Sequence, residues 1–230
     1  MRRELSEKEI LDTVRDIRHE APGIGAYKLY LMLKELYPDG MRGRDWFYGL
    51  MHESHLMLKP GKRRHTTSSN HPYRKYKNMI KGLTVNRINQ LWVADITYID
   101  TDEGVAYLHL LTDAFTHEII GWVLSDSLVA SNTVTALDMG ISHVSPLGFD
   151  GLIHHSDRGV QYCCNQYIDR LQAIKATISM TEDYKPTDNA IAERVNGIIK
   201  QEWLYRMKRP PDVVAARDLL ARIIDFYNNR

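Results

Sequence analysis

The sequence has few features of secreted or membrane proteins. Its 230 residues include only two cysteines, the neighbours Cys163 and Cys164, which supply neither a disulfide framework nor a zinc-finger spacing. No apolar run approaches the roughly 18 residues that a transmembrane helix needs. The charged N-terminus lacks the apolar stretch of a secretory signal. These absences exclude disulfide-stabilised and membrane-spanning classes, and they predict a cytoplasmic protein. With 43% apolar residues, the chain is long enough to bury a core.

Charge is distributed unevenly, although the formal net charge is only +1. Residues 1–90 carry 18 basic and 10 acidic side chains, whereas residues 91–230 carry 12 and 19. No acidic residue occurs between Glu53 and Asp95. A basic first part and an acidic second part favour a polyanion-binding module joined to a module that uses carboxylates. A solvated linker that keeps the chain soluble is the alternative.

Residues 7–53 have a helical pattern that is interrupted twice. Ser6 and Glu9 form a capping-box pair ahead of apolar residues at helical spacing. Proline and glycine at residues 22–25 and 38–40 predict turns. Three short helices fit a helix-turn-helix module whose third helix reads DNA, and a plain three-helix bundle that binds protein is the alternative. The adjoining basic stretch favours nucleic acid.

Residues 58–88 predict a basic linker with little regular structure, because Ser, Thr, Asn, Pro and Gly cluster there. Tyrosines alternate with cations at residues 73–77 (YRKYK). This pattern suits contact with a nucleic-acid backbone and its bases, and it equally suits docking of the linker onto the next domain. The candidate DNA-binding residues here are Lys62, Arg63, Arg64, Arg74, Lys75 and Lys77.

From Leu91 onward the pattern changes to five strand-like runs of β-branched and aromatic residues. They occupy residues 91–99, 105–112, 118–124, 151–156 and 176–180. Helical patterns occupy residues 131–143, 163–173, 190–204 and 214–227. Three consecutive strands followed by alternating helices and strands predict an α/β domain with a mixed sheet and helices on its faces.

Three acidic residues stand out by their positions. Asp95 lies inside an apolar strand, where an uncompensated charge costs several kcal/mol. Asp157 ends a second apolar strand, and Glu193 lies in the first turns of a helix. Carboxylates that converge from two strands and a helix form the oxygen-lined site that Mg²⁺ or Mn²⁺ prefers. Two such ions, about 3.5–4 Å apart, can activate a hydroxyl and stabilise the leaving oxygen of a phosphodiester. A strand Asp is also commonly a paired or capping residue, so the arrangement of all three carries this interpretation.

These acids stand in three motifs that resemble the signatures of DDE transposases. The motifs are residues 92–99 (WVADITYI), 155–162 (HSDRGVQY) and 188–193 (DNAIAE). Between Asp157 and Glu193 lie 35 residues, the spacing that is typical of the superfamily. The resemblance is strongest to the catalytic subunit of bacterial insertion sequences, which shares an integrase core with retroviruses, and it covers nearly the whole chain.

The resemblance implies a fold and a domain organisation. An RNase H-like core with a mixed five-stranded sheet flanked by helices is expected for residues 89–230. It would be preceded by a small all-α helix-turn-helix DNA-binding domain at residues 1–57 and by the basic linker at residues 58–88. Asp95 would lie on the first strand, Asp157 after the fourth and Glu193 on a late helix.

The resemblance also implies the chemistry and the partners. Asp95, Asp157 and Glu193 would be catalytic residues and ligands of Mg²⁺ or Mn²⁺, with two ions expected. The activity would be phosphodiester cleavage at the ends of a DNA element, followed by strand transfer through a 3′-hydroxyl. Implied partners are double-stranded DNA of the terminal inverted repeats and of the target, further copies of the chain in a homo-oligomer on DNA, and a subunit from an upstream reading frame. A bacterial, nucleoid-associated location follows.

Several residues and two alternative functions stay open. Arg158 follows Asp157 directly and is a candidate phosphate contact. Lys200, seven residues after Glu193, either holds DNA near the metals or is an exposed solubilising lysine. Asn189 is expected to cap the helix of Glu193. Relatives usually continue past Arg230, which leaves a truncated, catalytically inactive DNA-binding protein as one alternative function. A related RNase H-like nuclease that cuts without joining is the other.

Three further residues are rival ligands. His154 and His155 are expected to form hydrogen bonds rather than to bind a metal, because imidazole suits zinc better than magnesium. Glu202 is a weaker rival for the third acid, because it lies off the Glu193 face of the helix.

Overall fold

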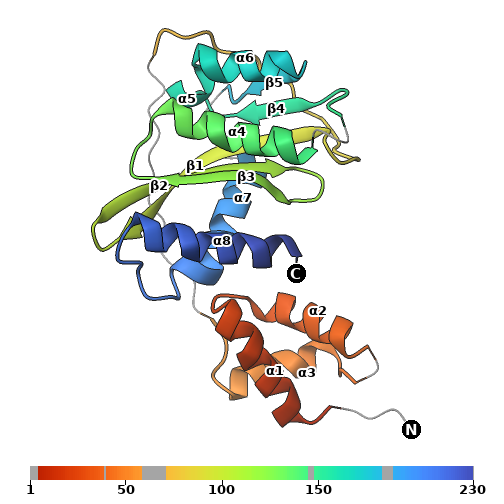
Figure 1. Cartoon of the computed structure of the whole chain (residues 1–230). Helices are drawn as coiled ribbons and strands as arrows, with labels where there is room; N and C mark the ends of the chain where they lie inside the picture. The colour runs from red at the N-terminus through yellow and green to blue at the C-terminus, as the bar shows by residue number, and fades with distance from the viewer. Residues whose placement is uncertain (1–4, 39, 59–70, 145–147, 183–188, 230) are drawn as a thin grey trace. The chain divides into compact units, whose positions relative to one another are not determined.

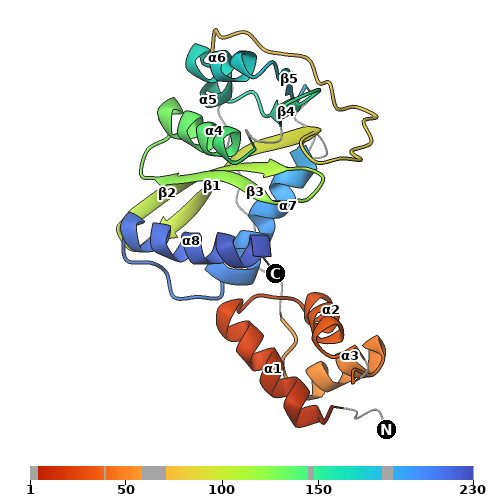
Figure 2. The same cartoon turned by 45° about the vertical axis from the view of Figure 1, so that its right-hand side comes forward.

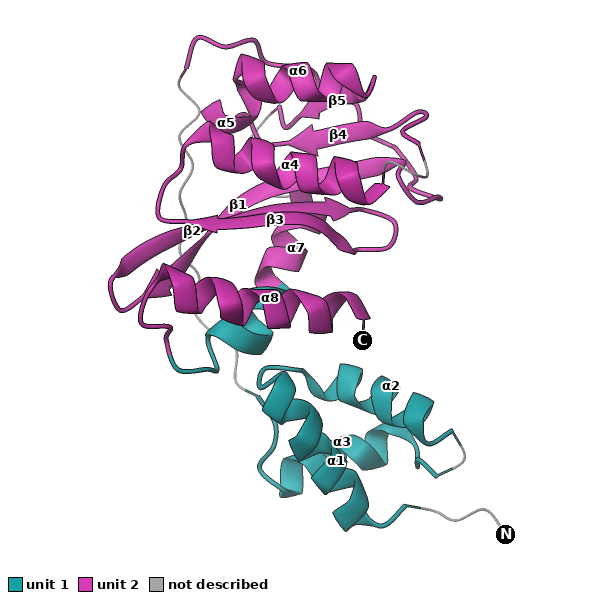
Figure 3. Cartoon of the chain, in the orientation of Figure 1, with its two compact units in different colours: residues 1–63, 198–208 teal, residues 64–197, 209–230 magenta. Residues whose placement is uncertain are grey.

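The computed structural model describes residues 5–38, 40–58, 71–144, 148–182 and 189–229. The chain forms two compact units (Figure 3). The first unit comprises residues 1–63 and 198–208, and the second comprises residues 64–197 and 209–230. Part of the predicted linker therefore belongs to the same unit as the predicted core. A short segment late in the predicted core belongs with the N-terminal helices.

The first unit contains three helices, as the sequence predicts. They are α1 (Glu7–Glu20), α2 (Ala26–Leu36) and α3 (Arg44–Glu53). The predicted capping box begins α1: the Glu9 backbone N–H donates to Ser6 Oγ at 3.3 Å, and the Ser6 N–H donates to Glu9 Oε2 at 2.9 Å. Buried apolar residues on all three helices, among them Val14, Leu33 and Phe47, form the core of this unit.

Residues 198–208 complete the first unit. They include η3 (Lys200–Leu204), a π-helical turn. Its buried Trp203 donates an indole hydrogen bond of 2.8 Å to the Glu20 carbonyl at the end of α1. Glu202 forms an ion pair of 2.9 Å with Lys28 on α2. These contacts explain why the sequence pattern of one long helix at residues 190–204 is divided between the two units.

The second unit is built on one five-stranded sheet (Figure 1). Its strands are β1 (Leu91–Thr101), β2 (Gly104–Asp113), β3 (Ile119–Ser125), β4 (Ile153–Ser156) and β5 (Thr177–Met180). Their order is β3-β2-β1-β4-β5; the pairs β1–β2 and β2–β3 are antiparallel, and β1–β4 and β4–β5 are parallel. This order confirms the predicted mixed, RNase H-like sheet with β1 at its centre.

Helices cover both faces of the sheet (Figure 2). One face carries α4 (Ala130–Val144), α5 (Val160–Cys163) and α6 (Asn165–Ala173). The other carries α7 (Ala190–Ile199) and α8 (Val213–Asn229). On α8, the Asn228 side chain accepts from the Ile119 N–H and donates to its carbonyl, both at 3.0 Å, which pairs the backbone of the edge strand β3. No helix in the described ranges is both long and apolar enough to span a bilayer.

One predicted helix is interrupted. The sequence predicts a continuous helix over residues 163–173, but Cys164 is extended, with φ −66° and ψ 147°, between α5 and α6. The break lets the two helices bury different residues: α5 buries Tyr162 and Cys163, and α6 buries Tyr167 and Leu171. All four residues belong to the same buried cluster, and the single periodic pattern of the sequence does not show the break.

Candidate active site

The centre of the sheet positions Asp95 and Asp157 next to each other. Parallel pairing places Val93 of β1 opposite His155 of β4. Asp95 and Asp157 each follow two residues later, so both lie at the carboxyl side of this pairing, on the same face of their strands. The order of the strands thus brings Asp95 and Asp157 close together, although 61 residues separate them in the sequence.

Asp95 is a partly exposed side chain closely surrounded by protein. Its pKa is raised to about 7, mainly by burial and also by the nearby charges of Asp157 and, more weakly, Glu193. A hydrogen bond of 2.6 Å from the Asn196 amide to Asp95 Oδ2 acts in the opposite direction by favouring the charged form. The strand position therefore holds a carboxylate that lacks a compensating cation among the described residues.

Asp157 is held by the turn that follows β4. Its Oδ1 accepts a hydrogen bond of 2.8 Å from the Gly159 N–H. Burial raises the pKa of Asp157, whereas that hydrogen bond and the nearby His71 ring lower it. A side chain at Gly159 would crowd this oxygen, because an added Cβ would lie 2.9 Å from Asp157 Oδ1. Gly159 therefore permits the close turn.

Glu193 is supplied by α7 and is exposed. Two hydrogen bonds hold this part of the chain against β1. Asn189 donates to the Ala94 carbonyl at 3.1 Å, and Asn196 donates to Asp95. Glu193 and Asn196 are three residues apart and thus lie on one face of the helix. The predicted cap by Asn189 is wrong, because its Oδ1 has no hydrogen-bond partner among the described residues. Its amide instead fastens the helix to the sheet.

The three acids are electrostatically coupled, but they do not form a closed metal pocket. In the described part of the chain, no group of three or more His, Cys, Asp or Glu side chains is arranged to hold a metal ion. The donors nevertheless fit a hard divalent cation, because they are carboxylate oxygens and both aspartates have raised pKa values. Asp95 and Asp157 supply the paired part of this donor set, and Glu193 lies at its edge.

The candidate DNA-binding residues fall into different environments. Arg74, Lys75 and Lys77 are exposed, and the Arg74 guanidinium stacks over the Tyr76 ring at 4.9 Å. Arg158 is half-buried and donates a hydrogen bond of 3.2 Å to the Glu182 carbonyl. Lys200 begins η3 in the first unit. Lys62, Arg63 and Arg64 lie outside the described residues.

The rival ligands are engaged elsewhere. His154 is buried, with Nε2 2.8 Å from the Tyr167 hydroxyl, and burial lowers its pKa to about 3. The His155 Nδ1 lies 2.8 Å from Ser179 Oγ. The expectation of hydrogen bonding is thus confirmed for both histidines. Glu202 pairs with Lys28 in the first unit.

Three residues near the acids were missed by the sequence reasoning. Asn196 had a usable signal, its position one helical turn after Glu193. Tyr162 also had one, as the last residue of the motif that contains Asp157. Its hydroxyl is buried without a partner among the described residues, and burial together with the two aspartates raises its pKa well above the usual value. His71 had no signal, because only the folded linker brings it near Asp157.

Comparisons with known proteins identify the family of this chain. The integrase core domain family matches residues 85–186, and a second integrase core domain model matches residues 174–230. The transposase for insertion sequence element IS904 of Lactococcus lactis is 30% identical over 97% of this chain and 88% of that protein. A 31 kDa protein of insertion element IS600 from Shigella sonnei is 34% identical over 82% of this chain and 69% of that protein.

Other comparisons are partial. A relative from insertion sequence element IS986/IS6110 of Mycobacterium tuberculosis is 34% identical over 62% of this chain, and the chain spans about half of that protein, 52%. Among solved structures, the magnesium complex of the HTLV-2 integrase catalytic core is 21% identical over 49% of this chain and 68% of that chain, with a TM-score of 0.40. The catalytic domain of Mos1 mariner transposase is 11% identical over 60% of this chain and 70% of that chain, with a TM-score of 0.45. These scores are too low to carry the fold assignment, which rests on the strand order.

Proposed function

Because this chain belongs to the insertion-sequence transposases that carry an integrase core domain, we propose that it cleaves phosphodiesters at the ends of a DNA element and transfers the resulting 3′-hydroxyl to target DNA. The observation that carries this proposal is that Asp95 and Asp157 each follow two residues after a parallel pair, Val93 and His155, at the centre of the sheet. Glu193 approaches them on a helix that is tied to β1.

Asp95, Asp157 and Glu193 would hold Mg²⁺ or Mn²⁺, and we propose two ions. Bound ions would activate the attacking water or 3′-hydroxyl and stabilise the leaving oxygen.

The chain's own residues position the reacting groups. Asn196 donates to one oxygen of Asp95, and the Gly159 N–H donates to one oxygen of Asp157, so both carboxylates are held in place. Positioning and electrostatic stabilisation account for most of the catalysis of phosphoryl transfer. The proposed reaction therefore needs no covalent bond between protein and DNA.

The partners follow from the proposed reaction. We propose that α1–α3 bind the terminal inverted repeats, with α3 as the reading helix, and that the basic linker and Lys200 bind the phosphate backbone of element and target DNA. Joining two ends requires at least two copies of the chain, so we propose a homo-oligomer assembled on DNA. An upstream-frame subunit is a further proposed partner. The site of action would be the bacterial nucleoid, where this DNA lies.

A cleavage and strand-transfer assay tests the proposal. End-labelled duplexes that carry the element termini are incubated with the protein, a target plasmid and Mg²⁺ or Mn²⁺. We expect nicking at the 3′ end of the element and joined products. Asp157→Asn should remove both activities and leave DNA affinity largely unchanged. Retained strand transfer in Asp157→Asn would contradict the assignment.

The same assay separates the two alternatives. Cleavage without joined products indicates an RNase H-like nuclease. Binding to the terminal repeats without either product indicates a DNA-binding protein that has lost catalysis. Both outcomes would refute the proposed strand transfer, and they leave the fold assignment unaffected.

A further inference from the structure

The described part of the linker crosses the edge of the catalytic sheet. We define the strap as residues 71–85, which have no helix or strand and belong to the second unit. β5 ends the sheet order, so its outer side needs a cover. The strap supplies it: the Met180 N–H donates to the Lys77 carbonyl at 3.3 Å, and the Met79 N–H donates to Ser179 Oγ at 2.8 Å.

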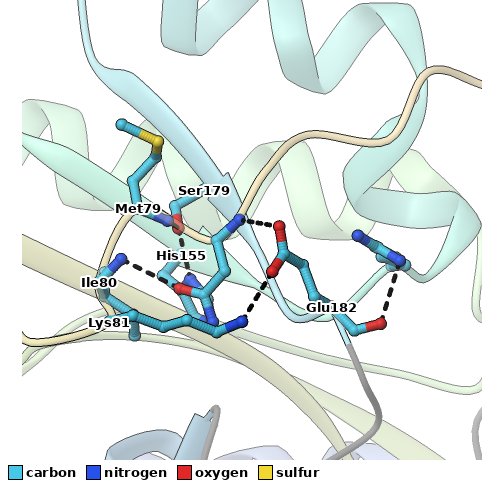
Figure 4. Close-up of polar contacts among 8 residues, drawn as sticks. Met79, Ile80, Lys81, His155, Ser179 and Glu182 are labelled. Atoms are coloured by element: carbon cyan, nitrogen blue, oxygen red, sulfur yellow. Dashed lines mark hydrogen bonds and ion pairs between the residues drawn. The ribbon is translucent and has the colours of Figure 1, made fainter.

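Glu182, two residues after β5, binds the strap at two points (Figure 4). Its Oε1 accepts from the Asn78 N–H at 3.1 Å, and its Oε2 pairs with Lys81 Nζ at 2.8 Å. Its backbone carbonyl accepts from the Arg158 guanidinium at 3.2 Å. One residue therefore joins the strap to the turn that contains Asp157.

The start of the strap reaches the same turn directly. His71 Nε2 lies 2.7 Å from the Arg158 carbonyl, and because a carbonyl only accepts, the ring nitrogen must donate. The His71 ring is also close enough to Asp157 to lower the pKa of its carboxyl group. The strap is thus held at both ends of its first half, by His71 and by Glu182.

The end of the strap packs against a buried cluster of the second unit. Its apolar residues contact a buried cluster that includes Val93 of β1 and Ala192 of α7. Ala192 directly precedes Glu193 in the sequence, and Val93 lies two residues before Asp95. The strap residues in this contact are Ile80, Leu83 and Val85. The strap therefore contacts the turn that contains Asp157 through His71, and it packs against the cluster to which Val93 and Ala192 belong.

We propose that the strap is part of the catalytic machinery and that Glu182 is the positioning residue that holds it there. This inference rests on the proposed function. The outward side of the strap carries the exposed cations Arg74, Lys75 and Lys77. DNA phosphate bound by these cations would be presented beside the carboxylates, so that binding of the basic linker places the scissile bond at the metal site.

Surface ion pairs generally stabilise little, so a purely structural role for Glu182 predicts small effects. The pair between Arg170 and Asp138, with a separation of 3.2 Å and side chains 53% and 44% exposed, is a matched control in the same unit. The side chains of Lys81 and Glu182 are 56% and 30% exposed. Only Glu182 adds an acceptor for a strap N–H and a link to the Asp157 turn.

The first test is limited proteolysis of the full chain by trypsin, with cleavage after Lys75 and Lys77 followed by mass spectrometry. Glu182→Ala should release the strap and raise cleavage there at least about tenfold, because cleavage follows the population of the opened segment. In Arg170→Met, trypsin should cleave after Lys75 and Lys77 as slowly as in the wild type. The midpoint of thermal unfolding should change by less than about 2 °C in both variants, which excludes global unfolding.

The second test is the rate of end cleavage at saturating Mg²⁺. Glu182→Ala should lower kcat about tenfold and change DNA affinity by less than about twofold, as expected of a positioning effect. Glu182→Gln keeps an acceptor for the Asn78 N–H and loses only the ion pair, as does Lys81→Met. The kcat values of Glu182→Gln and Lys81→Met should therefore be similar to each other and lie between those of the wild type and Glu182→Ala.

Each result decides the inference. An unchanged tryptic rate in Glu182→Ala overturns it, whether or not the protein cleaves DNA. A released strap with unchanged kcat also overturns it, because the strap would then be held without positioning the site. A wild type that shows no cleavage refutes the proposed function instead, and the tryptic rates still decide whether Glu182 holds the strap.

Discussion

Asp95 and Glu193 belong to one proposed site but occupy opposite environments. Asp95 is enclosed in the central strand with a pKa of about 7, whereas Glu193 is exposed on α7. An enclosed carboxylate disfavours its own charged form, so a bound cation stabilises the folded protein through Asp95. An exposed carboxylate has no such cost. The comparison predicts that the two proposed ligands contribute equally to activity and unequally to stability.

The largest expected effect tests whether the two acids are equal in activity. Asp95→Asn and Glu193→Gln should each reduce end cleavage to background, because each removes a proposed metal ligand. Cleavage of labelled element ends over a range of Mg²⁺ concentrations measures this effect. Cleavage by Glu193→Gln near the wild-type rate would remove Glu193 from the site.

The second prediction concerns the pH dependence of stability in the metal-free protein. Folded Asp95 keeps a proton up to a pKa of about 7, whereas the ordinary value is 3.8. At this group the folded state thus binds more protons between these values, so the contribution of Asp95 to the free energy of unfolding falls as pH rises through this window. Asp95→Asn should remove this fall and stabilise the metal-free protein at pH 7 by an amount on the order of a few kcal/mol.

Urea unfolding at several pH values measures that difference. Glu193→Gln is the matched variant and should retain the pH dependence of the wild type. Added Mg²⁺ should stabilise the wild type at pH 7 more than Asp95→Asn. A pH dependence of stability between pH 4 and 7 that is the same in the wild type and in Asp95→Asn would contradict the assigned environment of Asp95.

The third prediction concerns Asn196, which connects the two acids because it lies on the helix of Glu193 and donates to Asp95. Asn196→Ala should lower cleavage roughly 10- to 100-fold, as is usual when an outer ligand partner is lost. Asn228→Ala is the control, since that side chain pairs the backbone of Ile119 on the edge strand. It should lower stability without changing the metal concentration needed for half-maximal cleavage. Asn196→Ala, in contrast, should need more metal for half-maximal cleavage. If it needs the same metal concentration as the wild type, Asn196 does not position Asp95.

The smallest effect is expected at Tyr162, whose buried hydroxyl has no partner among the described residues. Tyr162→Phe should raise the free energy of unfolding by about 1 kcal/mol, because it removes an unpaired buried polar group. Tyr167→Phe should have the opposite sign, since that hydroxyl contacts His154 Nε2 at 2.8 Å. Chemical denaturation measures both. A loss of cleavage in Tyr162→Phe would show that the hydroxyl acts on the aspartates.

Local patterns were sufficient for most of the elements. The alternation of β-branched and aromatic residues predicted each of the five strands to within a few residues, and the three N-terminal helices followed from their apolar spacing and turns. The break at Cys164 was not predictable in this way, because the apolar spacing of residues 163–173 is that of one continuous helix. Domain boundaries at residues 57 and 88 remain predictions.

The sequence by itself determined which residues are acidic, which segments are strands and where the basic stretch lies, because these properties depend on composition and short-range periodicity. Only the tertiary structure decided that Asp95 and Asp157 are neighbours, since parallel pairing of β1 with β4 joins segments far apart in the chain. It also decided that Glu193 stays exposed and that the strap docks through Glu182. Such contacts depend on the order of strands and on which surfaces are buried, and neither property is contained in a local pattern.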